Sequence, residues 1–161
     1  MSGGEGVAQD VEKARKAAFR LLRFRPRSTW ELTTRLRKTF TEETCHIVLQ
    51  ELLEKRLLDD EAFSRFWIEN RVQFKPVSKA LLAQELRAKG VNPSVIQEAL
   101  GSTPQSDRAM AERLLASRHK RIGPKDPKRY ERLYRFLRSR GFTHELVSEL
   151  LEKDAPETHD R

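Results

Sequence analysis

The first part of the chain has the residue spacing of an amphipathic helix. Between residues 14 and 24 one face collects small and apolar side chains that recur three or four positions apart: Ala14, Ala17, Ala18 and Leu21. A second stripe of the same segment is basic and is made of Lys16, Arg20, Arg23 and Arg27. The pattern predicts a helix with one face for packing and another face that is strongly positive.

Residues that start and stop helices divide the rest of the chain into further helical segments. Ser28 and Glu31 form a capping-box pattern, in which each side chain satisfies a backbone N–H at the start of a helix. Thr41 and Asp59 are the next predicted caps. Later starts and stops are predicted at Ser78, Gly90, Asn92-Pro93, Ser106 or Asp107, Asp126-Pro127, Gly141 and Thr143. No strand-like alternation of useful length is present, so an all-α fold with about nine helices is expected.

The helical segments repeat along the chain with a period of about 51 residues. The stretch from Glu85 to Val91 aligns with that from Phe136 to Phe142, and each contains Leu-Arg followed by a glycine. The first copy, Arg35 to Phe40, is one residue shorter and lacks the glycine. A unit of this size buries little surface alone, so stacking of neighbours should complete the core. We therefore expect an elongated tandem array of three three-helix repeats, over 10–57, 58–103 and 104–153, with disordered ends at 1–9 and 154–161.

Composition narrows the class of protein. The chain has 161 residues, 37% hydrophobic and 35% charged, with 7 Gly and 7 Pro, which excludes a collagen-like or wholly disordered protein and a large multidomain enzyme. The single cysteine, Cys45, excludes an intramolecular disulfide framework and a cysteine-rich zinc site. No apolar run approaches the roughly 20 residues that span a bilayer, and the first residues do not resemble a signal peptide. We expect a soluble, cytoplasmic monomer without a membrane partner.

Net charge points to an acidic partner. The chain carries 32 Lys and Arg against 24 Asp and Glu, a formal net charge of +8. The excess lies at both ends of the sequence, with +4 over residues 1–58 and +6 over 107–153, whereas residues 59–106 are neutral. A basic protein of this kind favours polyanions or acidic protein surfaces.

The sequence contains no recognisable catalytic or metal-binding constellation. Its four histidines are scattered, and neighbouring Cys45 and His46 would point about 100° apart on a helix. No glycine-rich phosphate loop or nucleophile elbow is present. The acidic run Asp59 to Glu61 could suggest Mg²⁺, but carboxylates at a helix start are better explained as a cap and partners of the helix dipole. We expect a protein that is not an enzyme and needs no cofactor.

Two basic stretches are the candidate binding surfaces. Residues 13–38 contain ten basic residues and one acid, and residues 118–140 contain ten and two. In the second stretch an apolar face of Tyr130, Leu133, Tyr134 and Leu137 should leave a separate basic face of Lys128, Arg132 and Arg135. Such stripes can be merely solvated, but two dense stretches of one sign favour a polyanion or an acidic partner. Trp30, Trp67, Tyr130 and Tyr134 lie at core-like spacings, which indicates packing rather than stacking on bases.

Three short motifs, taken in order, resemble the RecX family of regulatory proteins. Residues 58–63 (Leu58, Asp59, Asp60 and Phe63 at the fixed positions) resemble its Leu-Asp-Asp-x-x-Phe signature. Upstream, residues 27–32 resemble its Arg-Ser-x-x-Glu-Leu element, and downstream Glu85, Leu86 and Gly90 fit its Glu-Leu-x-x-Lys-Gly-Ile element. The resemblance covers residues 14–152. It departs at Arg56-Leu57, where the family usually has a Gly-aromatic pair, at Ser64, where alanine is usual, and in residues 74–78, where Pro76 stands in a segment in which Gly is common.

The resemblance implies a modulator of the RecA recombinase. Members are elongated helical proteins that bind in the groove of the RecA filament on DNA, inhibit its ATPase and strand exchange, and favour disassembly, and some also bind DNA directly. The basic residues Lys16, Arg20, Arg23, Arg27, Lys128, Arg132 and Arg135 would then be candidates for partner or DNA contact, and the motif residues would be structural. A sequence-independent DNA-binding module and a purely structural helical adaptor remain as alternatives.

Overall fold

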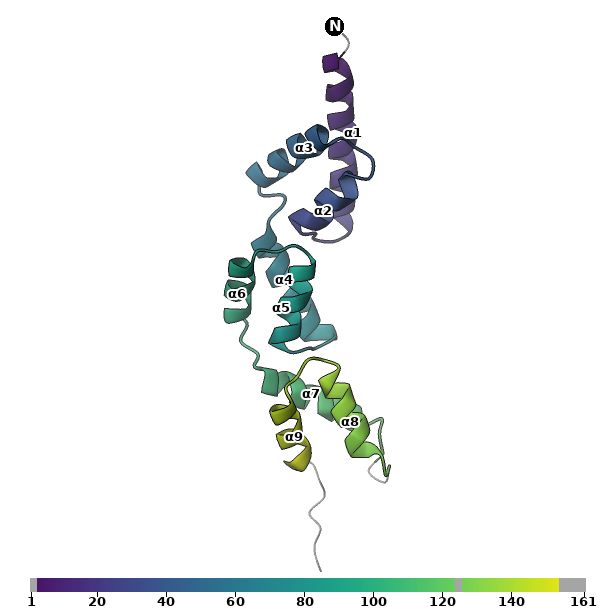
Figure 1. The fold of residues 1–161 in the computed structure, drawn as a ribbon, viewed down its shortest axis with the longest axis vertical. Helices are drawn as coiled ribbons and strands as arrows, with labels where there is room; N and C mark the ends of the chain where they lie inside the picture. The colour runs from purple at the N-terminus through teal and green to yellow at the C-terminus, as the bar shows by residue number, and fades with distance from the viewer. Residues whose placement is uncertain (1–2, 124–125, 154–161) are drawn as a thin grey trace, which may run out of the picture. The chain divides into compact units, whose positions relative to one another are not determined.

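The computed structural model describes residues 3–123 and 126–153, and this part of the chain folds into nine α-helices without a strand, which confirms the all-α prediction (Figure 1). The helices are α1 (Gly3–Phe24), α2 (Thr29–Leu36), α3 (Glu42–Glu54), α4 (Asp60–Phe74), α5 (Lys79–Ala88), α6 (Pro93–Gly101), α7 (Asp107–His119), α8 (Arg129–Arg138) and α9 (His144–Lys153).

The predicted helix caps are present and explain where most helices begin. At α2 the Glu31 N–H donates to Ser28 Oγ at 3.1 Å, and the Ser28 N–H donates to the Glu31 carboxylate at 3.3 Å. At α4 the Asp59 carboxylate accepts from the N–H groups of the second and third helical residues. The side chains of four further caps, Thr41, Ser78, Ser106 and Thr143, each accept the N–H of the residue three positions on. These bonds satisfy N–H groups that a helix leaves without internal partners.

Two helix starts differ from the sequence prediction. Residues 1–9 were expected to be disordered, but α1 begins at Gly3, because the helix that packs through Val11 and Ala14 continues towards the N-terminus. The predicted opening of α8 at Asp126-Pro127 is also displaced, since α8 begins at Arg129. The Asp126 carboxylate accepts the Lys128 N–H at 2.9 Å and forms a turn ahead of the helix rather than its cap. The expected disordered tail, 154–161, lies outside the described residues.

The described chain forms two compact units whose boundaries fall within helices, after Trp67 in α4, after Gln84 in α5 and after Ala99 in α6. The first unit contains α1–α3, the start of α4, the end of α5 and α6 up to Ala99, and the second contains the remainder of these three helices with α7–α9. The compact units thus divide the middle repeat, as expected if a repeat completes its core with its neighbours. The repeat boundaries proposed from the sequence stay predictions.

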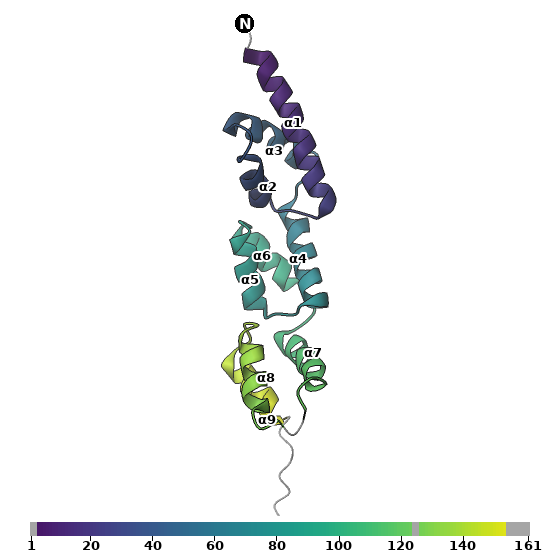
Figure 2. The same ribbon diagram turned by 90° about the vertical axis from the view of Figure 1, so that its right-hand side faces the viewer.

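The core of the first unit lies where α1 packs on α2 and α3, and Figures 1 and 2 show the N-terminal part of α1 continuing past these two helices. Ala14 and Ala18 are fully buried, which lets the backbone of α1 approach its neighbours closely. The other buried members of this core are Val11, Leu32, Leu36, Cys45, Val48, Leu52 and Leu58.

In the second unit α7, α8 and α9 pack against one another. Leu133 and Leu137 of α8 are buried as predicted, and Phe142 after α8 is fully buried. The remaining buried apolar residues of these helices are Met110, Ala111, Leu114, Leu115, Val147, Leu150 and Leu151.

Several aromatic residues expected in the core are exposed. Trp30 and Tyr130 each leave 52% of their surface exposed, whereas Trp67 and Tyr134 are half-buried. On α4 the buried apolar residues are Phe63, Ile68 and Val72, whereas Phe66 is exposed. Buried Ser64, Ile68 and Val72 recur every four residues, so a single stripe of α4 is buried and Phe66 lies outside it.

The end of α5 meets the start of α2 at what we name the first junction. Ser28 Oγ donates to the Lys89 carbonyl at 2.6 Å, and the Thr29 N–H donates to the Asp60 carboxylate at 2.7 Å. Gly90 has the left-handed φ of 72° that closes α5, and a Cβ there would lie 2.4 Å from Trp30 Cβ. The glycine is therefore required both by its backbone conformation and by the close approach of α2.

The second junction, entirely within the second unit, repeats this arrangement between the end of α8 and the start of α5. The Ser78 N–H donates to the Arg140 carbonyl at 2.9 Å, and the Lys79 N–H donates to the Asp107 carboxylate at 2.8 Å. Gly141 has a φ of 84°, and a Cβ there would lie 2.5 Å from Ser78 Oγ. In each junction a helix C-terminus, with its carbonyl groups, faces a helix N-terminus, so the two helix dipoles attract.

Candidate nucleic-acid interface

The predicted basic stripe of α1 forms one wall of a positively charged surface, and α2 supplies a second wall. We name this surface the basic face; its residues are Lys13, Lys16, Arg20, Arg23, Arg35 and Lys38. Helical periodicity in the sequence predicts Lys16, Arg20 and Arg23 as candidates but not Lys13, Arg35 or Lys38. The last two belong to the same basic stretch in sequence, and only the packing of α2 on α1 brings them beside Arg20.

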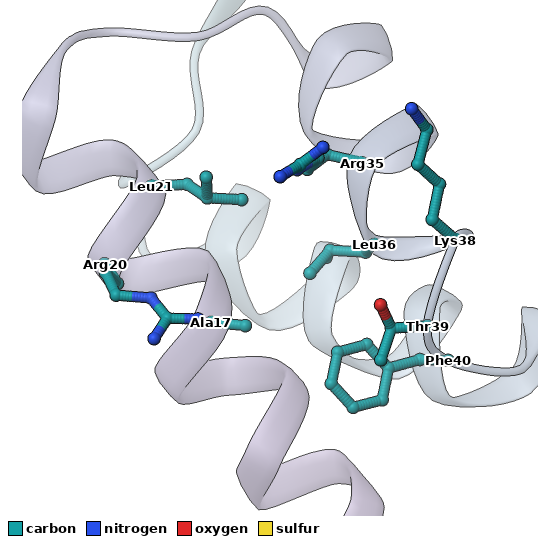
Figure 3. Close-up of a pocket in the computed structure, with 8 residues that line it drawn as sticks. All are labelled: Ala17, Arg20, Leu21, Arg35, Leu36, Lys38, Thr39 and Phe40. Carbon is teal, nitrogen blue, oxygen red and sulfur yellow. The ribbon is translucent and has the colours of Figure 1, made fainter.

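The basic face is hollowed by adjoining cavities. One of about 430 Å³ lies between α1 and α2, with Arg20 and Leu21 on one side and Arg35, Leu36 and Phe40 on the other (Figure 3). A second, of about 460 Å³, shares Arg20 and Phe40 with the first and extends along α1. Its further lining residues are Lys13, Lys16 and Ala17. Both cavities are lined by cationic and apolar residues, with Thr39 added in the first, and neither is lined by a carboxylate.

The cations of this surface are mostly unpaired. Within the described part of the chain, Arg20, Arg23, Arg35 and Lys38 make no hydrogen bond or ion pair. Lys16 lies 3.6 Å from the Glu12 carboxylate in an exposed contact one helical turn apart, which contributes little. Unpaired, exposed guanidinium and ammonium groups keep their charge and hydrogen-bond donors available to an anionic partner.

An exposed aromatic patch adjoins the basic face at the end of α1. Phe19 is 44% exposed and Phe24 is 82% exposed, and together with Arg20 and Arg23 they line a hollow of about 670 Å³. Neither phenylalanine was predicted from the sequence to bind a partner, because its pattern indicated a stacking role for no aromatic residue. The available signal was helical spacing, since Phe24 lies four residues after Arg20 and Arg23 lies four residues after Phe19.

Arg27 has a structural contact that separates it from the rest of the predicted stripe. It follows the end of α1, and its Nε donates to the Leu21 carbonyl at 3.3 Å. Burial, followed by repulsion from the guanidinium groups of Arg25 and Arg35, lowers the pKa of Arg27. The side chain therefore stabilises the C-terminal end of α1, where a cation is favoured.

The candidate binding residues of the last repeat lie close to acidic side chains. Arg132 is bound to the Asp126 carboxylate at 2.8 Å, and Arg135 is paired with Glu131 one turn away. Lys128 is exposed and directly precedes α8. The exposed side of α8, expected to be purely cationic, therefore carries positive and negative side chains in alternation. Its role in binding a partner stays a prediction.

The signature residues lie in the core or at the first junction. Leu58, Phe63 and Leu86 are buried. Asp59 caps α4, whereas Asp60 binds the N–H of Thr29 and so caps α2, a role that its place in the acidic run did not indicate. Glu85 accepts from Trp67 Nε1 at 2.9 Å, and Gly90 closes α5.

A small ionic cluster surrounds the first junction. Glu31 accepts hydrogen bonds from Arg25, at 3.1 Å for each guanidinium nitrogen, and from Lys89 Nζ at 2.8 Å. Burial alone would raise the pKa of Glu31, but the hydrogen bonds from Arg25 and Lys89 outweigh it and lower the pKa to about 2. Lys89 also lies 4.2 Å from the centre of the Trp67 ring.

Other reactive groups do not form a site. Cys45 is buried and His46 is exposed on α3, and burial raises the pKa of the Cys45 thiol. The described residues hold no cluster of three or more potential metal ligands, and none of their helices is long and apolar enough to cross a membrane. Among described residues the basic face is the surface best suited to bind a partner, by contact with phosphate or carboxylate groups.

Comparison with known proteins places the whole array in one family. Residues 14–52 match the first three-helix domain of RecX, residues 59–100 the second and residues 106–151 the third. The chain is 32% identical to "Regulatory protein RecX" of Streptomyces coelicolor, over 96% of this chain and 86% of the relative. It is 34% identical to the protein of the same name from Mycobacterium avium, over 87% of this chain and 83% of the relative.

Solved structures show the same fold. The crystal structure of RecX from Lactobacillus salivarius superposes with a TM-score of 0.69 at 18% identity, over 91% of this chain and 97% of that one. A second structure, titled regulatory protein RecX, gives a TM-score of 0.75 at 22% identity, over 91% and 75% of the two chains. Taken with the three domain matches and the sequence relatives, these likenesses show that the chain belongs to the RecX family of regulatory proteins.

Proposed function

We propose that this protein binds the RecA filament on DNA and modulates, mostly by inhibition, its recombinase and ATPase activity, and so regulates DNA repair. The observation that carries the proposal is the match of all three helical domains, in order, to the three RecX domains. Regulation here means binding by surface complementarity, without a chemical step on a substrate.

The basic face supports this proposal on physical grounds. A RecA–DNA filament exposes phosphate groups as well as protein surface, and unpaired cations on α1 and α2 offer it a complementary field. The face lacks carboxylates in its cavities, so an approaching phosphate meets no repulsion there. We expect the face to contribute mainly long-range attraction and salt-dependent affinity.

Sequence-independent DNA binding is the second candidate function. The observation that favours it is the same run of unpaired cations beside exposed Phe19 and Phe24, a combination that can hold a sugar–phosphate backbone without reading its sequence. The two functions predict different requirements for RecA.

Retention on immobilised single-stranded DNA separates the two functions. If retention requires RecA, and if the protein shortens RecA filaments viewed directly, the first function is supported. Retention of equal strength without RecA would instead support the second function. A protein that is retained in neither case, and that leaves filament length and ATPase rate unchanged, would contradict both.

A further inference from the structure

Thr39 is an exposed threonine whose hydroxyl the fold does not use. Most serine and threonine hydroxyls of the described residues cap a helix or donate to a carbonyl group, as those of Ser28 and Thr33 do. Thr34 and Thr39 differ, because within the described part of the chain neither hydroxyl makes a hydrogen bond. Thr34 lies inside α2, whereas Thr39 lies in the turn after it, with its N–H bonded to the Leu36 carbonyl at 3.0 Å. A group attached to the Thr39 oxygen would therefore displace no hydrogen bond of the fold.

The surroundings of Thr39 are cationic. It lines the cavity of about 430 Å³ between α1 and α2 together with Arg20, Arg35 and Lys38 (Figure 3). These three cations make no ion pair within the described residues, and no carboxylate lines the cavity. Thr39 is thus an uncharged side chain with a free hydroxyl among unpaired positive charges of the basic face.

A phosphoryl group on Thr39 would largely neutralise this part of the basic face. Such a group carries about −1.5 to −2 charges at pH 7 and three strong acceptor oxygens. Guanidinium and ammonium groups are the donors that bind it best, and the cavity holds three of them. The carbonyl groups at the end of α2 would repel the phosphoryl group, but they carry only partial charges. The full charges of the three cations outweigh them, so the modification would place its charge against the basic face.

The turn that holds Thr39 also suits the active site of a protein kinase. Three exposed cations precede Thr39 by four, two and one positions: Arg35, Arg37 and Lys38. Kinases select substrates partly by the charges near the target hydroxyl, so this segment fits a kinase with an acidic substrate cleft. Ser28 also follows arginines, but it is fully buried and bonded at the first junction. Exposure therefore favours Thr39 over Ser28 as the modified residue.

We propose that Thr39 is phosphorylated by a protein serine/threonine kinase, and that the phosphoryl group closes the basic face to anionic partners. In the transfer, Thr39 Oγ1 forms a bond to the γ-phosphorus of a nucleoside triphosphate, and the bond from that phosphorus to the β-phosphate oxygen breaks. A nucleoside diphosphate leaves, and the hydroxyl proton passes to a base of the kinase. This inference rests on the proposed role of the basic face in binding a partner that contains DNA, and it adds a means of regulation.

The effect on binding is tested with a matched pair of variants in the full chain. Thr39→Glu places a negative charge beside the cations, whereas Thr39→Gln has the same size and no charge. The probes are a labelled single-stranded oligothymidylate and a RecA filament assembled on it. Thr39→Glu should bind each probe about fivefold to tenfold more weakly than Thr39→Gln, with a shallower salt dependence. Full-length protein with genetically encoded phosphothreonine at this position should bind more weakly still, and phosphatase treatment should restore its affinity.

Gln97→Glu is the control for total charge. Gln97 is exposed on α6, outside the basic face, and the substitution adds the same charge as Thr39→Glu. Its affinity for both probes should equal that of the unmodified chain. Equal weakening by Thr39→Glu and Gln97→Glu, or equal affinities of Thr39→Glu and Thr39→Gln, would overturn the inference. An unmodified chain that bound neither probe would overturn the proposed function as well, so the two failures are distinguishable.

The occurrence of the modification is measured separately. Mass spectrometry of the full-length protein, isolated from its own cells before and after DNA damage, should find a phosphoryl group on Thr39 in at least one of the two samples. Its absence from both samples, or a phosphoryl group on Thr34 alone, would show that Thr39 is not the modified residue and that the proposal is wrong.

Discussion

At the scale of single residues, Arg56 shows the cost of a departure from the family pattern. Its φ of 52° lies in the left-handed region that glycine adopts readily, and α3 closes around it with a Leu57 N–H bond to the Leu52 carbonyl at 2.9 Å. In the family resemblance drawn from the sequence, this position corresponds to the glycine of the Gly-aromatic pair that Arg56-Leu57 replaces. The backbone conformation is thus retained although the residue that favours it is absent.

Arg56→Gly should stabilise the protein. Removing the Cβ relieves the left-handed conformation and should raise the free energy of unfolding by about 1 kcal/mol. Urea unfolding followed by circular dichroism measures the change. Lys55→Gly serves as the matched control, since Lys55 has a φ of −81° and should lose stability instead. Equal effects of the two variants would contradict this account of Arg56.

Gly90→Ala should have a large opposite effect. The new methyl group would overlap Trp30 at 2.4 Å and would place alanine at a positive φ, so a loss of about 2 kcal/mol or more is expected. Thermal and urea unfolding give the value. Gly101→Ala is the control, because a Cβ there meets nothing within 4 Å. Similar stabilities of both variants would mean that α2 and α5 approach less closely than described.

At the scale of helices, local signals were readable in the sequence and long-range ones were not. Ser28, Thr41, Asp59 and Ser106 cap helices through residues two or three positions on, so their roles follow from short patterns. Asp60 binds a residue 31 positions away, and no local pattern announces such a contact. The alignment of Gly90 with Gly141 was the single sequence feature that pointed to the junctions.

The same distinction explains what was predicted of the candidate site. The basic stripe of α1 is a property of one helix and was found from its period. Arg35 and Lys38 join this stripe only through the packing of α2 on α1. Arg132 forms an ion pair with Asp126, a residue that precedes α8 and so lies outside the helical pattern. Helical period places residues on a face but does not say which charges find partners.

The ionic cluster of the first junction makes the free energy of unfolding depend on pH. The pKa of Glu31 is about 2 in the folded chain and about 4.3 in an unfolded one. The ionised carboxylate therefore stabilises the fold fully above pH 4.3. This contribution is lost as the pH falls through 4 towards 2. Glu31→Gln should cost on the order of 2 kcal/mol at pH 7 and about half as much near pH 3. Urea unfolding at both pH values tests this.

Glu149→Gln is the comparison for Glu31. Glu149 also has a pKa of about 2, through hydrogen bonds from Arg108 and Lys153, but it is well exposed, so solvent screens the interaction. We expect little change in stability from this variant. If Glu31→Gln also changed little at pH 7, the cluster would contribute no net stability at the first junction.

At the scale of the whole molecule, net charge and unpaired cations are distributed differently along the chain. The first and last repeats both carry an excess of cations, yet among the described residues Arg20, Arg23, Arg35 and Lys38 make no ion pair whereas Arg132 and Arg135 are paired. Net charge along the sequence therefore overstates the similarity of the two ends. We expect the first repeat to dominate electrostatic binding.

Reversing charge at Lys16 and Arg20 should weaken binding to a RecA–DNA filament strongly and flatten its salt dependence, because phosphate contacts set the salt slope. Reversal at Arg132 and Arg135 should act in the same direction but less, since their present partners already neutralise them. Fluorescence anisotropy over a range of salt concentrations measures both slopes. Folding should change by only about 0.5 kcal/mol per site.

The matched control is Arg65→Glu with Arg87→Glu, two exposed cations of the neutral middle repeat, which changes net charge equally. Lys79 is unsuitable, because its ammonium group binds the carbonyls of Leu100 and Thr103. A control that weakens binding as much as Lys16 and Arg20 would show that only total charge matters. Unchanged affinity in all three double variants would direct attention to uncharged surfaces.

The shared helices α4 and α5 govern how this chain can be dissected into fragments. A fragment ending after the second repeat would lack Arg140 and Asp107, leaving the N–H groups of Ser78 and Lys79 without the acceptors that now satisfy them. A fragment that begins after the second repeat would keep Arg140 and Asp107 but lack Ser78 and Lys79, so the second junction would be lost in that fragment too. Truncation at repeat boundaries would therefore confuse loss of a binding surface with loss of folding, and point substitutions in the intact protein are the sounder way to map its activity.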